Sequence, residues 1–116
     1  MRRRRQGADR AGRRRALAAR RARARLKAAR GRNGSEQAAV AGDALRGYIA
    51  DRFDLPEAGL TPDAVGGVLR EHGTDDSVCL DLLERIGAAR YAPLPPGAAG
   101  WLEETERVLE SLERST

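Results

Sequence analysis

The sequence predicts an all-α protein, a small four-helix bundle preceded by an Arg-rich N-terminal arm that is helical or disordered. From residue 35 onward, apolar residues recur at steps of three to five, as on one face of a helix. Residues with strong helix-start and helix-stop preferences separate these segments. No stretch alternates apolar and polar residues in the way that a half-buried strand would.

Charge divides the chain into a basic arm with its hinge, residues 1–34, and an acidic body, residues 35–116. Residues 1–32 hold 15 basic side chains and one acid, a formal charge of +14, whereas residues 33–116 carry a formal charge of −9. Such asymmetry is typical of a basic segment attached to a folded domain. We therefore expect the body to fold independently of the arm.

The arm has the composition of a helix with little to bury. Ala, Arg and Leu favour helix over residues 8–30, and Gly31 with Asn33-Gly34 should end it. Leu17 and Leu26 fall on opposite sides of a helical wheel. The apolar stripe between them is alanine: Ala11, Ala18, Ala22, Ala28 and Ala29.

The first two helices of the body have recognisable ends. Ser35 is the predicted N-cap of a helix that runs to about Phe53, where Asp54-Leu55-Pro56 stops it. Thr61 should cap the next helix, with Pro62 at its first position, and Gly73 should end it. The inward residues are Val40, Leu45, Tyr48, Ile49 and Phe53 in the first, and Val65, Val68 and Leu69 in the second.

Two further helices complete the predicted bundle. Thr74-Asp75-Asp76 should start one that stops near Tyr91, and the prolines of residues 92–97 forbid helix and form a crossover. The last helix should span residues 98–113. The inward residues are Cys79, Leu82, Leu83 and Ile86 in the first of these, and Trp101, Leu102, Val108, Leu109 and Leu112 in the second.

The residues that often carry chemistry have structural interpretations here. Asp75 and Asp76 match a helix start better than a cation site, and Cys79 and Trp101 occupy core positions. His72 precedes Gly73 at a helix C-terminus, where positive charge is favourable. No phosphate-binding loop, metal-ligand set or nucleophile–base pair is present. The sequence thus predicts a non-enzymatic protein without cofactor or metal, and its single cysteine fits a reducing compartment.

The basic arm is a candidate site for anionic surfaces. Phosphates of nucleic acid need only Arg and Lys, although the arm lacks the aromatic residues on which single-strand binders stack bases. It also lacks the apolar face of membrane-inserting helices, but electrostatic contact with anionic headgroups remains open. A solvated tail without a partner is the third possibility. The candidate binding residues are Arg2, Arg3, Arg4, Arg5, Arg13, Arg14, Arg15, Arg20, Arg21, Arg23, Arg25 and Lys27.

Short motifs of the body resemble one known family. "LRGYIADRFDLPEAGLTPDAV", "VLREHG" and "LLERIGAARYAP" are similar to the cytoplasmic C-terminal tail of BatD, the oxygen-tolerance (aerotolerance) family. The resemblance covers roughly residues 35–114, and the arm matches only in its Arg-rich character. In that family an Arg-rich stretch follows a single membrane helix and a small helical domain follows the stretch. The motifs mark helix boundaries and core positions.

The resemblance implies a non-enzymatic, helical interaction domain at the cytoplasmic face of the bacterial inner membrane. Members of the family are encoded beside von Willebrand A-type proteins and a MoxR-type AAA+ ATPase, so these are the implied protein partners within an envelope or oxidative-stress tolerance complex. The arm would then lie next to an anionic membrane. The alternative is a small cytoplasmic protein whose basic arm binds nucleic acid without sequence specificity.

Overall fold

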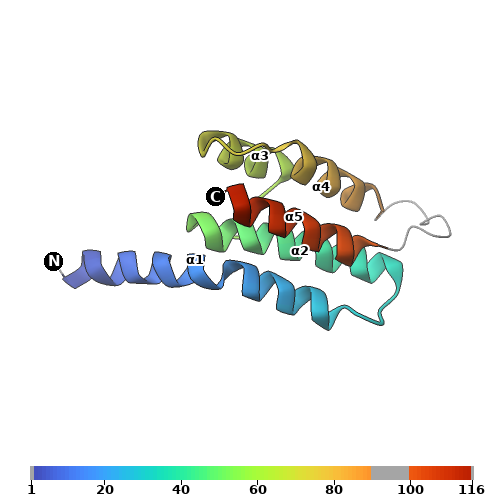
Figure 1. Cartoon of the computed structure of the whole chain (residues 1–116), viewed down its shortest axis with the longest axis horizontal. Helices are drawn as coiled ribbons and strands as arrows, with labels where there is room; N and C mark the ends of the chain where they lie inside the picture. The colour runs from blue at the N-terminus through green and yellow to red at the C-terminus, as the bar shows by residue number, and fades with distance from the viewer. Residues whose placement is uncertain (1, 90–99, 116) are drawn as a thin grey trace.

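The structure, a computed structural model, describes residues 2–89 and 100–115, with side chains from residue 9 onward. It confirms the all-α class, and the described residues contain helices and no strand. The described residues form five helices rather than four, because the arm itself is a regular helix that packs with the others (Figure 1). The helices are α1 (Arg2–Ala28), α2 (Gly34–Phe53), α3 (Pro62–Glu71), α4 (Ser77–Ala89) and α5 (Trp101–Ser115).

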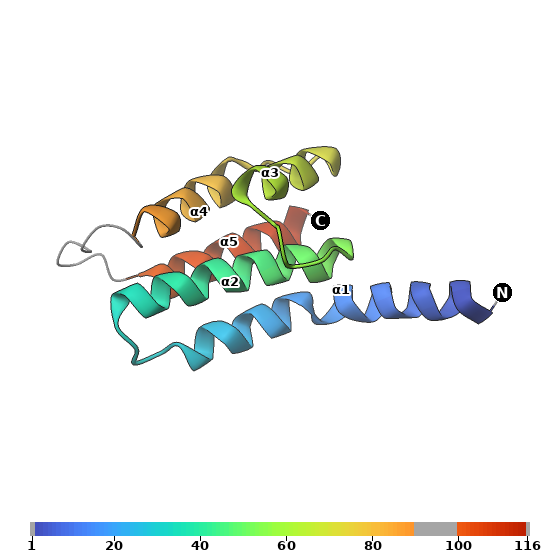
Figure 2. The same ribbon diagram turned by 180° about the vertical axis from the view of Figure 1, so that it is seen from behind.

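Helix α2 is the centre of the molecule and contacts all four other helices. Helix α1 runs antiparallel to α2 along one side, while α3 and α4 lie on the opposite side (Figures 1 and 2). Helix α5 contacts α1, α2 and α4, whereas neither α3 nor α4 contacts α1. The first turns of α1 extend beyond the other helices (Figure 2). The molecule therefore has an α1 side and an α3–α4 side.

The arm helix buries more than the alanine stripe suggested. Its inner face joins the same core as the body, and Leu26, expected beside the stripe, is only 5% exposed. Ala28, expected on the stripe, is exposed. The buried face of the helix is shifted towards Leu26, so that Leu26 is buried and Ala28 is exposed. This shift is favourable because the buried face gains one large apolar side chain. The buried residues of this segment are Ala18, Ala19, Ala22, Leu26 and Ala29.

The start of α2 differs from the expectation in its cap. Asn33, not Ser35, is the N-cap: its side-chain oxygen accepts a hydrogen bond from the Glu36 N–H at 2.8 Å. The Asn33 amide in turn donates to the Glu36 carboxylate at 3.2 Å. The two contacts satisfy the free Glu36 N–H in the first turn and hold the Asn33 and Glu36 side chains together. They therefore favour Asn33 over Ser35 as the N-cap. The helix ends at Phe53 as predicted, with Asp54 in the left-handed conformation at φ 55°.

Helix α3 has its predicted boundaries. Thr61 is the N-cap, and its hydroxyl accepts a hydrogen bond from the Ala64 N–H at 3.2 Å. His72 is the C-cap, and Gly73 follows at φ 70°, a left-handed conformation that glycine adopts without strain. Val65 and Leu69 are fully buried, and Val68 packs against the core at its edge.

Helices α4 and α5 bury the faces that the sequence predicts. All four inward residues of α4 are at most 3% exposed, and on α5 only Leu102 is half-buried rather than buried. Among the described residues, helix α5 starts at Trp101 and is preceded by Gly100 with a non-helical φ of 137°, whereas the expected start at residue 98 lies outside those residues. The expected stop near Tyr91 and the proline crossover at residues 92–97 lie outside the described residues. In the part of the chain that is described, no helix has both the length and the apolarity to cross a bilayer.

Candidate interaction surface on helix α1

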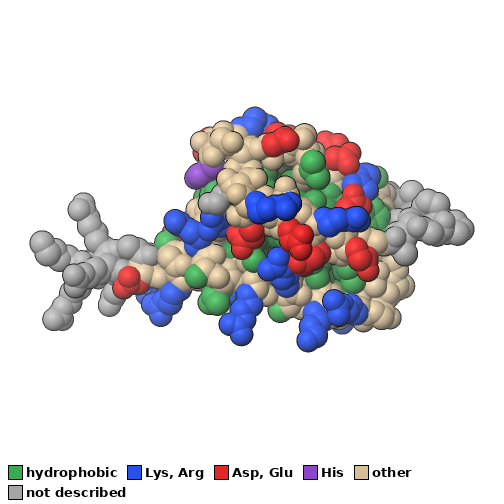
Figure 3. All heavy atoms as spheres, viewed as in Figure 1, with side chains coloured by type: hydrophobic (Ala, Val, Ile, Leu, Met, Phe, Trp, Pro, Cys, Tyr) green, Lys and Arg blue, Asp and Glu red, His purple; other side chains and the backbone are tan. Residues whose placement is uncertain are grey.

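The solvent side of α1 carries a line of basic residues that we call the outer row: Arg13, Arg20 and Lys27. Their spacing of seven residues is about two helical turns, or about 10 Å along the helix axis. All three are exposed, and no described acidic side chain pairs with them. Asp9, which is also exposed, lies four residues before Arg13 on the same face. Figure 3 shows basic side chains projecting along the lower edge of the molecule, where α1 lies.

Beside the outer row, a second set of arginines faces the body. Arg14 bridges the end of α2: its Nε lies 3.1 Å from Asp51 Oδ1, and its Nη1 lies 2.7 Å from Asp54 Oδ1. Its Nη2 also donates to the Leu55 carbonyl at 3.0 Å. The hydrogen bond to Asp54 is the largest cause of a raised pKa of the Arg14 guanidinium. Arg21 adds a longer pair with Asp51 at 3.6 Å.

Arg25 makes the most complete contact of this set. Its Nη1 and Nη2 donate to the two carboxylate oxygens of Glu57 at 2.6 and 3.3 Å, and Nη1 also donates to the Asp43 carbonyl at 2.8 Å. The hydrogen bond from Arg25 lowers the pKa of Glu57. Gly47 lies beneath this pair, where a Cβ would stand 2.8 Å from Arg25 Nη1. A glycine at this position therefore leaves room for the guanidinium to cross α2.

These contacts form one unit that we call the flank cluster: Arg14, Arg21 and Arg25 with Asp51, Asp54 and Glu57. All of its members except Asp54 line a groove of about 450 Å³ between α1 and α2, whose other lining residues are alanine and glycine. On the other flank of α1, Arg23 Nε lies 2.6 Å from Glu106 Oε1 of α5. Body carboxylates thus border the outer row on both sides, each held by an arginine.

The candidate residues from the sequence therefore separate into distinct groups. Arg13, Arg20 and Lys27 share the outer row, whereas Arg14, Arg21, Arg23 and Arg25 contact the body. Arg2–Arg5 occupy the first turns of α1, and their side chains lie outside the described residues. Sequence reasoning missed Asp51, Asp54, Glu57 and Glu106 as partners. Only the acidic charge of the body pointed to them.

Arg15 lies apart from both groups. It lines a cavity of about 310 Å³ with Arg52 and His72, at a place where α2, α3 and α5 all end. Helix C-termini carry partial negative charge, so basic side chains there stabilise the helices. The His72 ring also packs on Phe53 with centroids 4.3 Å apart. His72 is the C-cap of α3, at the helix C-terminus where the sequence placed it.

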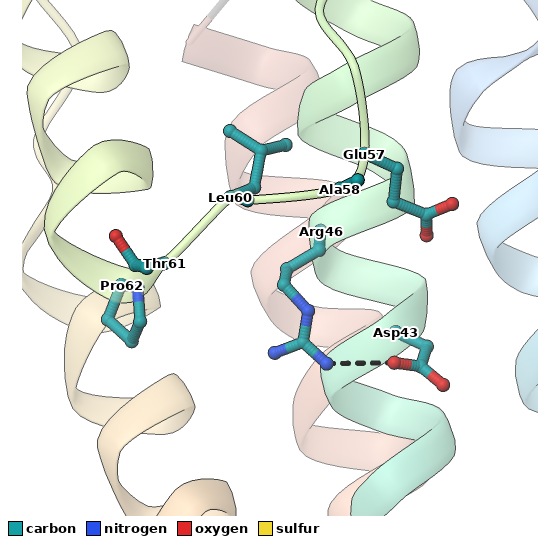
Figure 4. Close-up of a pocket in the computed structure, with 8 residues that line it drawn as sticks. Asp43, Arg46, Glu57, Ala58, Leu60, Thr61 and Pro62 are labelled. Atoms are coloured by element: carbon teal, nitrogen blue, oxygen red, sulfur yellow. Dashed lines mark hydrogen bonds and ion pairs between the residues drawn. The ribbon is translucent and has the colours of Figure 1, made fainter.

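A third hollow, of about 570 Å³, lies between α2 and the segment that leads into α3 (Figure 4). Arg46 extends from α2 into it and pairs with Asp43 at 2.8 Å. Leu60, Thr61 and Pro62 form the opposite wall. Glu57 also lines this hollow and is paired with Arg25, so each charged side chain of the lining already has a partner of opposite charge.

The remaining candidates for chemistry serve the fold. Cys79 is 1% exposed, and burial, with a smaller effect from Asp76, raises the pKa of its thiol to about 12. Asp75 accepts hydrogen bonds from the Ser77 N–H and hydroxyl at the start of α4, and Asp76 pairs with Arg70 at 2.6 Å. Within residues 2–89 and 100–115, no three side chains are grouped to hold a metal ion.

Comparisons with protein-family models, curated proteins and solved structures found no match to this chain.

Proposed function

We propose that the protein is a non-enzymatic helical interaction domain that docks on an anionic membrane surface through the outer row of α1. The observation that carries this proposal is the division of basic residues on α1. The arginines that face the body pair with its carboxylates, while Arg13, Arg20 and Lys27 face solvent in a line. The pairing leaves a line of exposed basic side chains, with Asp9 at its N-terminal end, on a molecule whose body is acidic.

The shape of this edge favours a flat partner over a grooved one. The outer row lies on a convex helix, so the tips of its side chains reach a plane together. In a DNA major groove, which is about 12 Å wide, phosphates would approach both flanks of the helix. The arginines on those flanks are already paired with body carboxylates, so they add no free positive charge for phosphates that approach from the sides. The contact with a membrane would be electrostatic, because the outer face offers little beyond alanine to insert.

The resemblance to the BatD tail supports the same proposal. In that family a basic stretch precedes a small helical domain next to the inner membrane, and α1 with the body of this chain has that order. The protein partners that the resemblance implies are a von Willebrand A-type protein or a MoxR-type AAA+ ATPase. They would bind the body on the cytoplasmic side, where α3 and α4 lie away from α1. An oxygen-tolerance complex is the corresponding biological setting.

Co-sedimentation with lipid vesicles tests the proposal. The full chain should bind vesicles containing phosphatidylserine but not pure phosphatidylcholine, and binding should weaken steeply between 0.1 and 1 M salt, as the Debye length falls from about 10 to about 3 Å. Removing two charges of the outer row, Arg20→Gln with Lys27→Gln, should weaken binding about 25-fold at low salt, since each basic residue near the surface contributes about 1 kcal/mol.

A matched control removes two charges from the far side of the molecule. Arg70→Gln with Arg85→Gln gives the same net charge, but these residues belong to α3 and α4, which do not contact α1. This double variant should change binding by less than about twofold. Equal loss in both double variants would show that net charge alone governs binding and would contradict the outer row as a site. Preference for duplex DNA over anionic vesicles at matched salt would favour the nucleic-acid alternative.

A further inference from the structure

The flank cluster raises a question that the proposed function leaves open. Asp51, Asp54 and Glu57 border the outer row, and bare carboxylates there would repel an anionic surface. Each of them is held by an arginine of α1. Glu57 is held by both terminal nitrogens of Arg25, with the pair positioned over Gly47.

We propose that the flank cluster is a charge mask: Arg14, Arg21 and Arg25 neutralise the carboxylates beside the outer row, so that the closed bundle lies with α1 flat on an anionic lipid surface. This proposal rests on the proposed function, because it concerns the same surface. In this arrangement the flank arginines act on the carboxylates and do not leave the body to reach the lipid.

Magnitudes favour the closed arrangement over release of α1. Contact of Arg23 and the three arginines of the flank cluster with lipid would tighten binding by about fivefold each, or about 600-fold together. Release would expose the four buried alanine methyls of the arm, and each exposed methyl would weaken binding by about fourfold, or about 250-fold for all four together. Exposing Leu26 would weaken binding by at least about tenfold more, and the ion pairs between α1 and the body would be lost as well. The total cost exceeds the gain, so α1 stays on the body.

The test compares vesicle binding of the full-length chain with that of three variants at the Arg25–Glu57 pair. Arg25→Gln unmasks Glu57 and should weaken binding to phosphatidylserine vesicles about fivefold, although Arg25 is outside the outer row. Glu57→Gln leaves the Arg25 charge unopposed and should tighten binding by up to about fivefold. The double variant removes the pair without changing net charge and should bind within about twofold of the unmodified chain.

A distant ion pair of the same kind is the matched control. Arg70→Gln, Asp76→Asn and their combination alter the pair between α3 and α4, far from α1, and should each change binding by less than about twofold. Helical circular dichroism and thermal unfolding of every variant verify that the fold is retained. Because the altered pairs are exposed at the surface, little loss of stability is expected.

The double variant decides between the two arrangements. If Arg25 leaves the body and contacts lipid directly, the double variant will bind as weakly as Arg25→Gln, and the charge mask is overturned. Hydrogen exchange provides a second readout: amides of α2 should keep their protection when the unmodified chain binds vesicles, and faster exchange there would also overturn the mask. If the unmodified chain does not bind anionic vesicles at low salt, the proposed function fails, and the mask fails with it.

Discussion

Small side chains decide how closely α1 and α2 approach. Ala22 of α1 and Ala44, Gly47 and Ala50 of α2 line the groove between the two helices. Residues of this size allow close packing of backbones, and at Gly47 even one methyl would press on the Arg25 guanidinium. The same choice of residues limits the apolar area that α1 can bury. Electrostatic contacts therefore matter more for α1 than for the other helices.

Cys79 is a residue whose chemistry the fold suppresses. Burial raises the pKa of its thiol to about 12, so almost no thiolate exists at pH 8. We expect a thiol reagent such as a maleimide to leave the native chain unmodified for hours at pH 8 and to label it completely in denaturant. Time-resolved mass spectrometry measures this difference. Rapid labelling of the native chain would show that the thiol is accessible and would contradict the packing of α4.

Each helix of the body packs a continuous apolar face, whereas α1 contributes one large apolar side chain. Leu26 is 5% exposed amid alanines that are themselves buried. It is the apolar anchor of the arm, and the ion pairs with the body act around it. A boundary at residue 34 therefore separates the basic segment from the acidic one. Because α1 packs on the body, however, we expect that deleting residues 1–32 lowers the stability of residues 33–116.

Replacing Leu26 tests this role of α1. Leu26→Ala should lower the free energy of unfolding by about 2–5 kcal/mol, as for other buried leucines, because it leaves a cavity between α1 and the body. Leu17→Ala changes a half-buried leucine on the same helix and should cost about 1 kcal/mol or less. Urea denaturation followed by circular dichroism gives both values. Equal, small losses in the two variants would mean that α1 is not anchored through Leu26.

For the whole molecule, the acidic body is a partner for the basic arm as well as a separate charged domain. Four arginines of α1 pair with carboxylates from α2, the α2–α3 connection and α5. Apart from Asp51, which is 15% exposed, the acids of these pairs are exposed to solvent, so most of the pairs contribute a modest amount, about 0–1 kcal/mol each. The contribution of these ion pairs to the free energy of unfolding depends on pH, because the carboxylates must be ionised.

Acid should remove the contribution of the Arg25–Glu57 pair. The hydrogen bond from Arg25 lowers the pKa of Glu57 below its ordinary value of 4.5. A lowered folded-state pKa gives stability that is fully present above about pH 4.5 and is lost as pH falls through the folded value. We expect Glu57→Gln to be less stable than the unmodified chain by up to about 1 kcal/mol at pH 7, and the difference should shrink as pH falls below about 4.5 and through the lowered pKa of Glu57.

Urea unfolding of both proteins at several pH values measures this difference. Glu84→Gln, which changes an exposed acid inside α4 that has no ion pair among the described residues, serves as the control, and its difference in stability from the unmodified chain should not depend comparably on pH. If the stability difference between Glu57→Gln and the unmodified chain stays constant from pH 7 to pH 2, the ionised Glu57 carboxylate is not the cause of that difference.

Much of the bundle could be predicted because its signals are local. Thr61-Pro62 starts α3 and Gly73 follows it, since capping and backbone conformation depend on neighbouring residues. The inward face of α4 was predicted correctly because periodic apolar residues need no knowledge of their partner. The cap of α2 was misplaced by two residues, because Asn33 and Ser35 are both good caps and the Glu36 contact decides between them.

The sequence by itself determined that the chain is helical and that basic and acidic charge are segregated along it. The tertiary structure alone decided which arginines face the body and which face solvent. Arg25 and Glu57 are 32 residues apart and Arg23 and Glu106 are 83 apart, so no local spacing relates them. Such pairs form only after packing has brought α1 against α2 and α5. The outer row therefore consists of basic residues of α1 that still face solvent after the body has packed against this helix.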